Sequence, residues 1–246
     1  MRIFSKTDIG KTRENNQDAY DCGVFPDGNA WAVVCDGMGG VSGGQVASSI
    51  CVDEVSKELK NGFNSEMTVS DVKILLRNAV EKANTAVFDK ATGDISLKGM
   101  GTTVVATIIL GTTAVIAHVG DSRAYVADIE NDKFYPVTKD HSLVQFYIDN
   151  GRITEEMAKT HPDRNIITRA VGIEHRVEAD FNVVSIDGKV LLICSDGLNG
   201  YVDDEDIFSV IKSDVQNSAE ELVEIANLAG GRDNITAVLV DASKGE

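Results

Sequence analysis

The chain has 246 residues, of which 43% are hydrophobic and 25% are charged, as in a globular protein with a sizeable core. Its formal net charge of -16 argues against non-specific binding to nucleic acid or to an anionic membrane, because both need a basic surface. No apolar run approaches the roughly 18 residues of a membrane span, the N-terminus lacks a signal-peptide core, and the four cysteines form no CxxC pair. We therefore expect a cytoplasmic protein without disulfides.

The N-terminal part of the chain predicts strands followed by two long helices. The expected elements are a strand at residues 2–9, a polar loop at 13–18, a hairpin turn at 25–29, a strand at 31–35, and helices at 42–60 and 70–89. Ser42 and Gln45 fit a capping box at the start of the first helix.

The rest of the chain is richer in strands. The expected elements are strands at residues 103–110, 113–119, 123–129 and 133–137, helical pieces near 142–150 and 154–159, strands at 181–186 and 190–194, helices at 203–212 and 218–229, and a strand at 234–240. Asp187-Gly188 predicts a hairpin between two of these strands. Strands and helices occur in blocks, which favours an α+β fold with antiparallel sheets over a doubly wound parallel sheet. We expect one domain over residues 1–246, with a flap-like insertion at about 143–170.

The Asp-Gly pairs of the sequence fall into two kinds. Asp27-Gly28 and Asp187-Gly188 lie between strand patterns and have the chemistry of turns. Asp36-Gly37 and Asp196-Gly197 each follow an apolar run that ends near a cysteine, and no returning strand comes next. A carboxylate at the tip of a core strand needs a partner.

Two further aspartates resemble the second kind, since Asp121 follows an apolar strand and Asp233 directly precedes the last one. If these strand ends meet, several carboxylates share a small volume, and a cation is needed to neutralise them. An all-oxygen ligand set selects a hard ion such as Mg²⁺ or Mn²⁺. The alternative is that each aspartate caps a turn or helix locally.

Eight short motifs occur in order and span nearly the whole chain. They are Arg13-x-x-Asn16-x-Asp18, Asp36-Gly37-Met38-Gly39-Gly40, Gly101-Thr102-Thr103, Gly120-Asp121-Ser122-Arg123, Asp140-His141-Ser142, Arg169-Ala170-Val171-Gly172, Ser195-Asp196-Gly197-Leu198 and Gly231-Arg232-Asp233-Asn234-Ile235-Thr236. Together they resemble the PPM-type metal-dependent protein serine/threonine phosphatases, the protein phosphatase 2C family, and the bacterial single-domain branch is the most similar.

The resemblance implies a four-layer α-β-β-α sandwich, in which two antiparallel sheets are flanked by helix pairs. It implies that Asp36 bridges two Mn²⁺ or Mg²⁺ ions, and that a third ion is bound as well. It also implies that the Gly37 carbonyl binds one core ion and that Asp196 and Asp233 bind the other. Asp18 would act behind them through metal-bound water, and Asp121 with Asp196 would bind the third ion. Arg13 would bind the substrate phosphate.

The implied reaction is hydrolysis of phosphoserine and phosphothreonine by direct attack of a metal-activated water. No cysteine is followed by five residues and an arginine, as a cysteine phosphatase loop would require. The expected partners are phosphorylated proteins and a cognate bacterial serine/threonine kinase, and we expect a monomer.

The sequence departs from the family pattern at three positions near the first Asp-Gly pair. Met38 stands where many relatives carry a histidine proposed as the general acid, Val41 where many bacterial members have histidine, and Gln45 where glutamate is common. None of these changes removes a metal ligand. His161, in the expected flap, is a weaker candidate for contact with the substrate.

Two other functions are considered. Ser42, within Gly40-Val41-Ser42-Gly43-Gly44, matches the nucleophile elbow of serine hydrolases, although that elbow requires the serine directly after its strand. A catalytically inactive phosphatase fold that acts as a binding module is expected to have lost a ligand aspartate, and none is lost. Four remaining residues are expected to be structural: Cys35, Cys194, His118 and His175.

Overall fold

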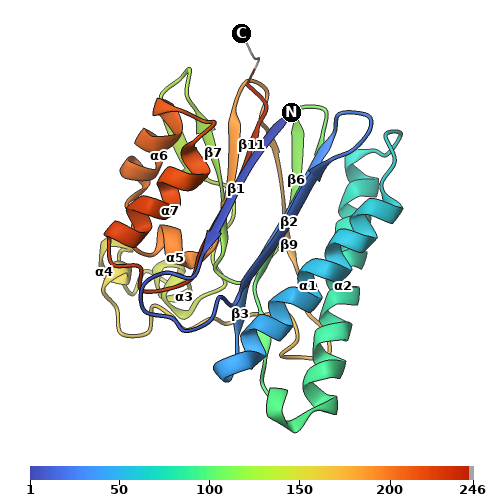
Figure 1. Ribbon diagram of the computed structural model, residues 1–246, viewed down its shortest axis with the longest axis vertical. Coiled ribbons are helices and arrows are strands. Elements are labelled where there is room, and N and C mark those ends of the chain that lie inside the picture. The colour runs from blue at the N-terminus through green and yellow to red at the C-terminus, as the bar shows by residue number, and fades with distance from the viewer. Residues whose placement is uncertain (244–246) are drawn as a thin grey trace.

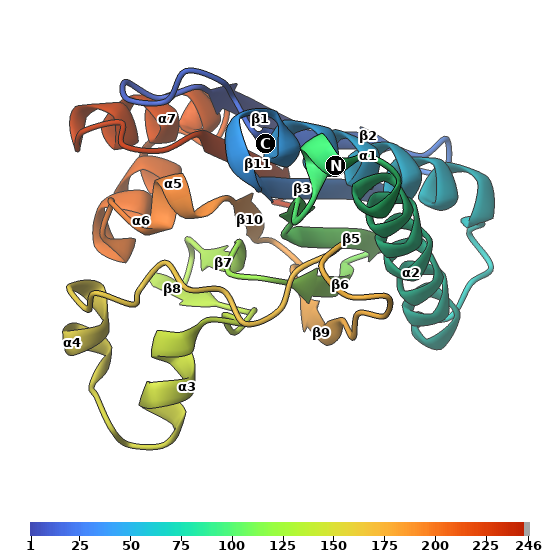
Figure 2. The ribbon, with the colours of Figure 1, turned by 90° about the horizontal axis from the view of Figure 1, so that it is seen from below.

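Two antiparallel sheets pack face to face between two groups of helices in the computed structural model, which describes residues 1–243 apart from the side chain of Val41 (Figure 1). The departure from the family pattern at Val41 therefore lies outside the described side chains. The view from below shows the same layers end-on (Figure 2).

Each sheet combines strands from distant parts of the chain. The five-stranded sheet has the order β1 (Arg2–Asp8), β11 (Ile235–Asp241), β10 (Val190–Cys194), β7 (Arg123–Asp128) and β8 (Lys133–Pro136). The six-stranded sheet has the order β2 (Asp18–Val24), β3 (Ala30–Met38), β5 (Val104–Leu110), β6 (Thr113–Val119) and β9 (Asp180–Ser185), and the short β4 (Gly101–Thr102) also pairs with β3.

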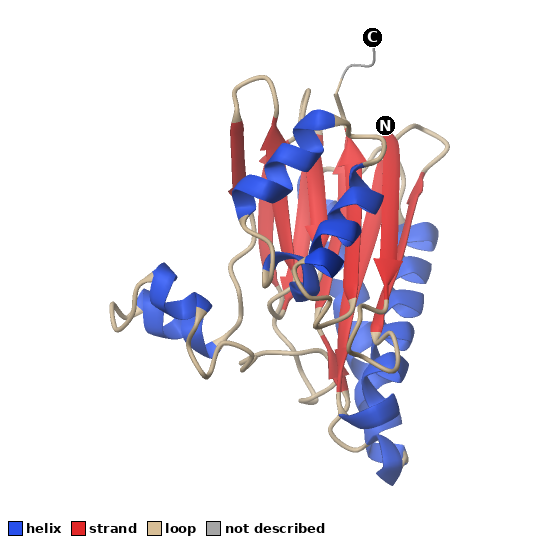
Figure 3. Cartoon of the chain, turned by 60° about the vertical axis from the view of Figure 1, so that its left-hand side comes forward, coloured by secondary structure: helices blue, strands red, loops and turns tan. Residues whose placement is uncertain are grey.

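Helices cover the outer face of each sheet and complete four layers. The six-stranded sheet is covered by α1 (Gly40–Gly62) and α2 (Val69–Gly93), which are followed by a 3₁₀ turn, η1 (Ile95–Leu97). The five-stranded sheet is covered by α5 (Asp196–Asn199), α6 (Asp204–Ser213) and α7 (Ser218–Leu228). Two short helices, α3 (Leu143–Asp149) and α4 (Glu155–Lys159), lie apart from these layers (Figure 3).

The buried apolar side chains form three layers, one between the sheets and one under each group of helices. Because successive side chains of a strand point to opposite faces, one strand supplies two of these layers. On β3, Val33 and Cys35 pack toward the helices, whereas Ala32 and Val34 pack between the sheets. The predicted α+β sandwich of two antiparallel sheets flanked by helices is confirmed.

Two local expectations need correction, the hairpin at Asp187-Gly188 and the capping box at Ser42. Asp187-Gly188 forms a turn, but its flanking strands do not make a hairpin, since β9 pairs with β6 and β10 pairs with β7 and β11. The strand β2, which precedes the Asp27-Gly28 turn, was expected without bounds, because its half-buried residues lack a clear apolar alternation. The hairpin turn at Asp27-Gly28 is confirmed and joins β2 to β3.

The capping box at Ser42 is wrong. The helix α1 begins earlier, at Gly40, and its N-cap is Gly39, which has a φ of 119° and no side-chain cap. Ser42 is an exposed residue of the first helical turn. This position also contradicts the nucleophile elbow, which would place the serine at the sharp turn between strand and helix.

Candidate active site

The register of β2 and β3 places two aspartates side by side at one end of the layer between the sheets. Ala32, Val34 and Asp36 follow at two-residue intervals along β3 and share the face that packs on the other sheet. Asp18 is the register partner of Asp36 on β2. The core strand therefore ends with a carboxylate that cannot leave the sheet interface without breaking this pairing.

Three more aspartates reach the same place from other elements. Asp196 begins α5 directly after β10, Asp233 precedes β11, and Asp121 lies in the turn between β6 and β7. A cleft of ≈ 710 Å³ collects these residues. Its lining includes Arg13, Asp36, Gly37, Met38, Asp121, Asp196 and Asp233. Asp18 is buried behind this lining, with 8% of its surface exposed.

Buried carboxylate oxygens in this cluster lack hydrogen-bond partners. The Oδ2 atom of Asp18 accepts bonds from the hydroxyls of Ser195 and Thr236, both at 2.7 Å. Its Oδ1 atom is buried without a partner, and so is the Oδ1 atom of Asp121 and of Asp196. Unpaired buried carboxylate oxygens are costly, so their convergence indicates that a cation belongs among them.

The electrostatics of the cluster support this reading. Burial, with neighbouring aspartates, raises the pKa of Asp18 to about 7 and that of Asp196 to about 6. Burial and the same kind of neighbours raise the pKa of Asp36 and Asp121 well above the usual range. Without a cation, the cluster must hold protons to remain compact.

The donor atoms suit a hard divalent ion. The five aspartates present carboxylate oxygens, which Mg²⁺ and Mn²⁺ prefer. Asp233 differs from the others, since its Oδ1 accepts a bond from the Asn234 N–H at 2.8 Å and its Oδ2 accepts one from Arg13 Nη2 at 2.6 Å. The residues present therefore fit a divalent metal centre, with Arg13 at its edge.

Some residues predicted for the site lie elsewhere. His161 packs edge-on against Tyr147, with ring centroids 5.5 Å apart, and the cleft lining drawn from the 143–170 segment consists instead of Asn165 and Ile167. Met38 does line the cleft, at the position where relatives were expected to carry histidine. Cys35 and Cys194 are fully buried, and burial raises the pKa of both thiols, as expected for core residues.

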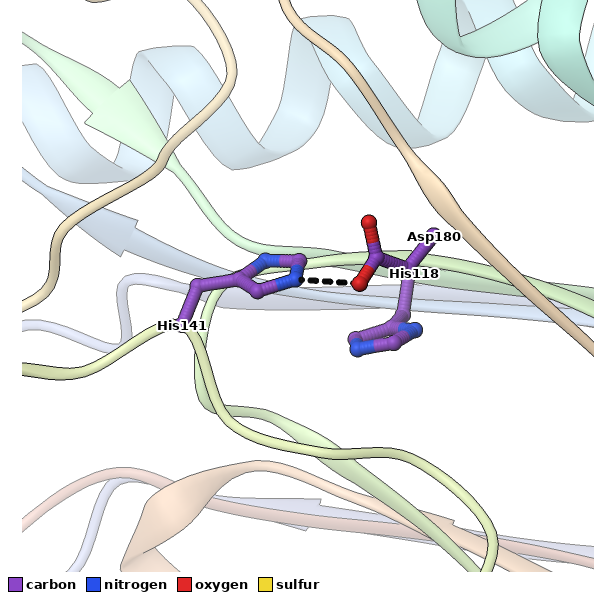
Figure 4. Close-up of side chains that lie close together, drawn as sticks. All are labelled: His118, His141 and Asp180. Carbon is purple, nitrogen blue, oxygen red and sulfur yellow. Dashed lines mark ion pairs between the residues drawn. The ribbon is translucent and has the colours of Figure 1, made fainter. Parts of the chain in front are cut away.

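Sequence reasoning missed two groups of polar residues around the cluster. Ser195 and Thr236 occur in the quoted motifs, but nothing in the sequence assigned them to Asp18. His118, expected to be structural, lies with His141 and Asp180 in a compact group whose ligand atoms are all within 4.8 Å of one another (Figure 4). These residues come from separate strands and loops, so local sequence patterns do not bring them together.

Comparison with known proteins gives consistent matches over almost the whole chain. A family model described as protein phosphatase 2C matches residues 10–229. A serine/threonine phosphatase of Listeria welshimeri is 38% identical over 246 residues, which cover 98% of this chain and 96% of the relative.

Solved structures show the same similarity. A serine/threonine phosphatase from Staphylococcus aureus has a TM-score of 0.91 at 34% identity, over 99% of this chain and 95% of that one. The catalytic domain of the serine/threonine protein phosphatase PstP, in complex with two manganese ions, has a TM-score of 0.84 at 33% identity, over 98% of this chain and 97% of that one.

Proposed function

The chain belongs to the protein phosphatase 2C family and is a protein serine/threonine phosphatase, and on this premise we propose that its aspartate cluster holds the divalent cations that the family requires. The observation that carries this proposal is the set of three buried, unpartnered carboxylate oxygens of Asp18, Asp121 and Asp196, in which burial and the charge of Asp196 raise the pKa of both other residues. The substrates are phosphorylated proteins. We propose that both phosphoserine and phosphothreonine are hydrolysed.

Each aspartate has a distinct part in this proposal. The charges of all four other aspartates act on Asp36, which would bridge two Mn²⁺ or Mg²⁺ ions, with the Gly37 carbonyl, Asp196 and Asp233 as further ligands. Asp18 would act from behind, and Asp121 would hold a third ion together with Asp196. When bound, the ions would lower the pKa of a water and neutralise phosphate oxygens, which is the chemistry that direct hydrolysis requires.

Arg13 would bind and orient the substrate phosphate. Its guanidinium is half-exposed at the cleft and donates to Asp233 across 2.6 Å. A guanidinium carries five N–H donors, so this single bond leaves donors for phosphate oxygens. The contact with Asp233 would keep the arginine at the edge of the metal site, where positioning and charge stabilisation dominate phosphoryl transfer.

We further propose that the protein acts as a monomer in the cytoplasm, where it reverses a cognate serine/threonine kinase. The four cysteines are unpaired, which suits a reducing compartment. Within the described residues, no helix is long and apolar enough to cross a membrane. Light scattering on the purified protein tests the monomer directly.

The experiment that tests the function is phosphate release from phosphoserine, phosphothreonine and phosphotyrosine peptides with Mn²⁺, with Mg²⁺ and with EDTA. We expect turnover of the first two peptides with a divalent ion and none in EDTA. Undiminished turnover in EDTA would overturn the metal mechanism.

A matched pair of variants distinguishes the loss of a carboxylate in the site from the general effect of losing any carboxylate. Asp196→Asn should reduce turnover by more than about 100-fold, because even outer partners of a metal ligand are worth 10- to 100-fold. Asp187→Asn changes the other kind of Asp-Gly pair, in an exposed turn, and should leave turnover unchanged. Equal turnover of the two variants would contradict the assigned role of Asp196.

A further inference from the structure

Four polar side chains gather beside the aspartate cluster, where the 143–170 segment joins the sheets. His118 comes from β6, His141 precedes α3, Arg169 lies at the end of the 143–170 segment, and Asp180 begins β9. The two histidine rings stack, with centroids 4.7 Å apart and planes 12° apart. Figure 4 shows the ring of His141 directed at the carboxylate of Asp180.

The hydrogen bonds of His141 define its tautomer. Its Nδ1 atom accepts a bond from the backbone N–H of Gly120 at 3.0 Å, so Nδ1 carries a lone pair. The proton of the ring is therefore on Nε2, which lies 3.3 Å from Oδ2 of Asp180. Nη1 of Arg169 also lies 3.2 Å from this Nε2, but its two hydrogens are directed to Asp180 and to the Glu178 carbonyl. Burial lowers the pKa of His141, which favours this neutral ring. Both ring nitrogens are engaged, so the group is a hydrogen-bonded network and not a metal site.

His141 holds Gly120 at both of its backbone groups. The Gly120 N–H donates to the ring, and the Gly120 carbonyl accepts a bond from the His141 N–H at 2.9 Å. Gly120 has a φ of +106°, and an added Cβ would lie 2.6 Å from Thr103 Cγ2. Gly120 therefore has little room to move, with the His141 ring holding the peptide before it and the His141 N–H holding the peptide after it.

The residue that follows this peptide is Asp121, one of the aspartates of the cluster. Its side chain is 7% exposed, and its Oδ1 is buried without a hydrogen-bond partner. A rotation of the Gly120-Asp121 peptide would turn this carboxylate away from Asp196. The His141 N–H bonds the carbonyl of this peptide, and the His141 ring bonds the N–H on the other side of Gly120, so the two bonds together oppose such a rotation.

His141 is itself held from the opposite side. Arg169 Nη1 donates to Oδ1 of Asp180 at 2.7 Å and to the Glu178 carbonyl at 3.0 Å, which fixes the carboxylate that faces the ring. The His141 carbonyl accepts a bond from the Thr168 N–H at 2.8 Å. His141 thus connects the base of the 143–170 segment with the Gly120-Asp121 turn, because it forms hydrogen bonds with both.

We propose that His141, held by Asp180 and Arg169, is a positioning residue that orients Asp121 to bind the third cation. The proposal rests on the proposed function, in which Asp121 is a ligand. His141 acts as a positioning residue through Gly120, the residue before Asp121.

Three substitutions of His141 test the two hydrogen bonds of its ring separately. In His141→Asn the amide oxygen follows Cγ, as Nδ1 does, and can still accept from Gly120. In His141→Gln the amide lies further out, where it can meet Asp180 but not Gly120. His141→Leu removes both bonds. As a control, His175→Leu changes an exposed histidine that packs edge-on against Phe88.

The measurement is a Mn²⁺ binding isotherm of each protein, together with its thermal unfolding in EDTA. We expect His141→Gln and His141→Leu to weaken the weakest Mn²⁺ site by about 10- to 100-fold, the usual effect of losing an outer partner of a metal ligand. The two tighter sites should be unchanged. His141→Asn and His175→Leu should bind Mn²⁺ as the wild type does.

Asp121→Ala provides the reference for loss of the third site. If it loses that site and His141→Leu does not, the proposal is wrong and the role of Asp121 stands. If the asparagine variant weakens binding as much as the leucine variant, the acceptor at Nδ1 has no special role and the proposal is also wrong. If Asp121→Ala binds Mn²⁺ like the wild type, the third ion and this proposal fail together. Failure of the phosphatase function would be seen separately, as absent turnover or absent tight sites.

Discussion

At the scale of single residues, the two carboxylate oxygens of Asp18 have different surroundings, which suits its proposed role behind the metal site. Ser195 and Thr236 donate to one of its oxygens, and the other oxygen is left buried and unpartnered. The hydroxyl of Thr236 also contacts that of Thr7 at 2.8 Å, so the network reaches β1. These bonds fix which oxygen faces the cluster, as outer partners of metal sites commonly do.

Replacing Thr236 by valine tests this arrangement. Thr236→Val keeps the shape of the side chain and removes the hydroxyl, so we expect Mn²⁺ to bind about 10-fold more weakly. Thr107→Val is the matched control, because Thr107 is also a fully buried strand residue and its hydroxyl donates to the Val115 carbonyl, away from the cluster. Equal Mn²⁺ affinities for the two variants in titration calorimetry would contradict the assignment.

The raised pKa values predict how pH affects the metal-free and metal-loaded protein. Between the usual aspartate pKa of about 3.9 and the values of about 6 for Asp196 and about 7 for Asp18, the native state holds protons that the unfolded chain has lost. The unfolding free energy of the metal-free protein should therefore fall as pH rises through this window.

Divalent ions bind the ionised carboxylates, so protons compete with them. At one fixed Mn²⁺ concentration, the rise in melting temperature should be larger at about pH 8 than at about pH 5.5. Scanning calorimetry with Mn²⁺ and with EDTA measures both effects. An equal rise at both pH values would show that these carboxylates are not the ligands.

At the scale of elements, the approach of α1 to β3 depends on a pair of glycines. A Cβ added to Gly37 would lie 2.0 Å from the Gly44 carbonyl oxygen, and one added to Gly44 would lie 2.5 Å from the Gly37 oxygen. The helix can therefore pack directly on the strand tip that carries Asp36. This contact also fixes the Gly37 peptide, whose carbonyl is a proposed metal ligand.

Gly44→Ala tests this contact, because its expected effect on the free energy of unfolding is opposite to the usual effect of a glycine-to-alanine change in a helix. Alanine normally stabilises a helix interior by about 1 kcal/mol relative to glycine. Here we expect a loss of about 1–3 kcal/mol, because the methyl group overpacks the strand. Gly93→Ala, at a helical glycine with nothing within 4 Å of an added Cβ, should have the same stability as the wild type or slightly more. Urea unfolding that gives both variants wild-type stability would contradict this account.

Turn chemistry predicted where the chain reverses but not which strands pair. Asp27-Gly28 and Asp187-Gly188 look alike in sequence, yet only the first joins neighbouring strands of one sheet. The partner of β9 is β6, which precedes it by more than sixty residues, and its pairing depends on burial across the whole sandwich. In the same way, the start of α1 depends on the left-handed Gly39 and not on the nearby serine.

At the scale of the whole molecule, the cluster lies where the two sheets meet. Asp18 and Asp36 belong to strands of the six-stranded sheet, whereas Asp196 and Asp233 adjoin strands of the five-stranded sheet. The sequence pattern singled out Asp36, Asp196 and Asp233, because each one ends or borders an apolar run where a hairpin turn is absent, whereas Asp18 was indicated only by the resemblance to the family. It could not show the hydroxyls around Asp18 or the His118-His141 group, since these contacts join residues far apart in the chain.

The most direct test of the account is the number of Mn²⁺ ions that Asp36→Asn retains, counted by equilibrium dialysis beside the wild type. Asp36 is proposed as the bridge, so its loss should remove both core ions, whereas Asp233→Asn should weaken only one. With the bridge gone, phosphate release should fall to the level seen in EDTA. Two tightly bound ions and wild-type turnover in Asp36→Asn would contradict the central claim that this aspartate organises the metal site.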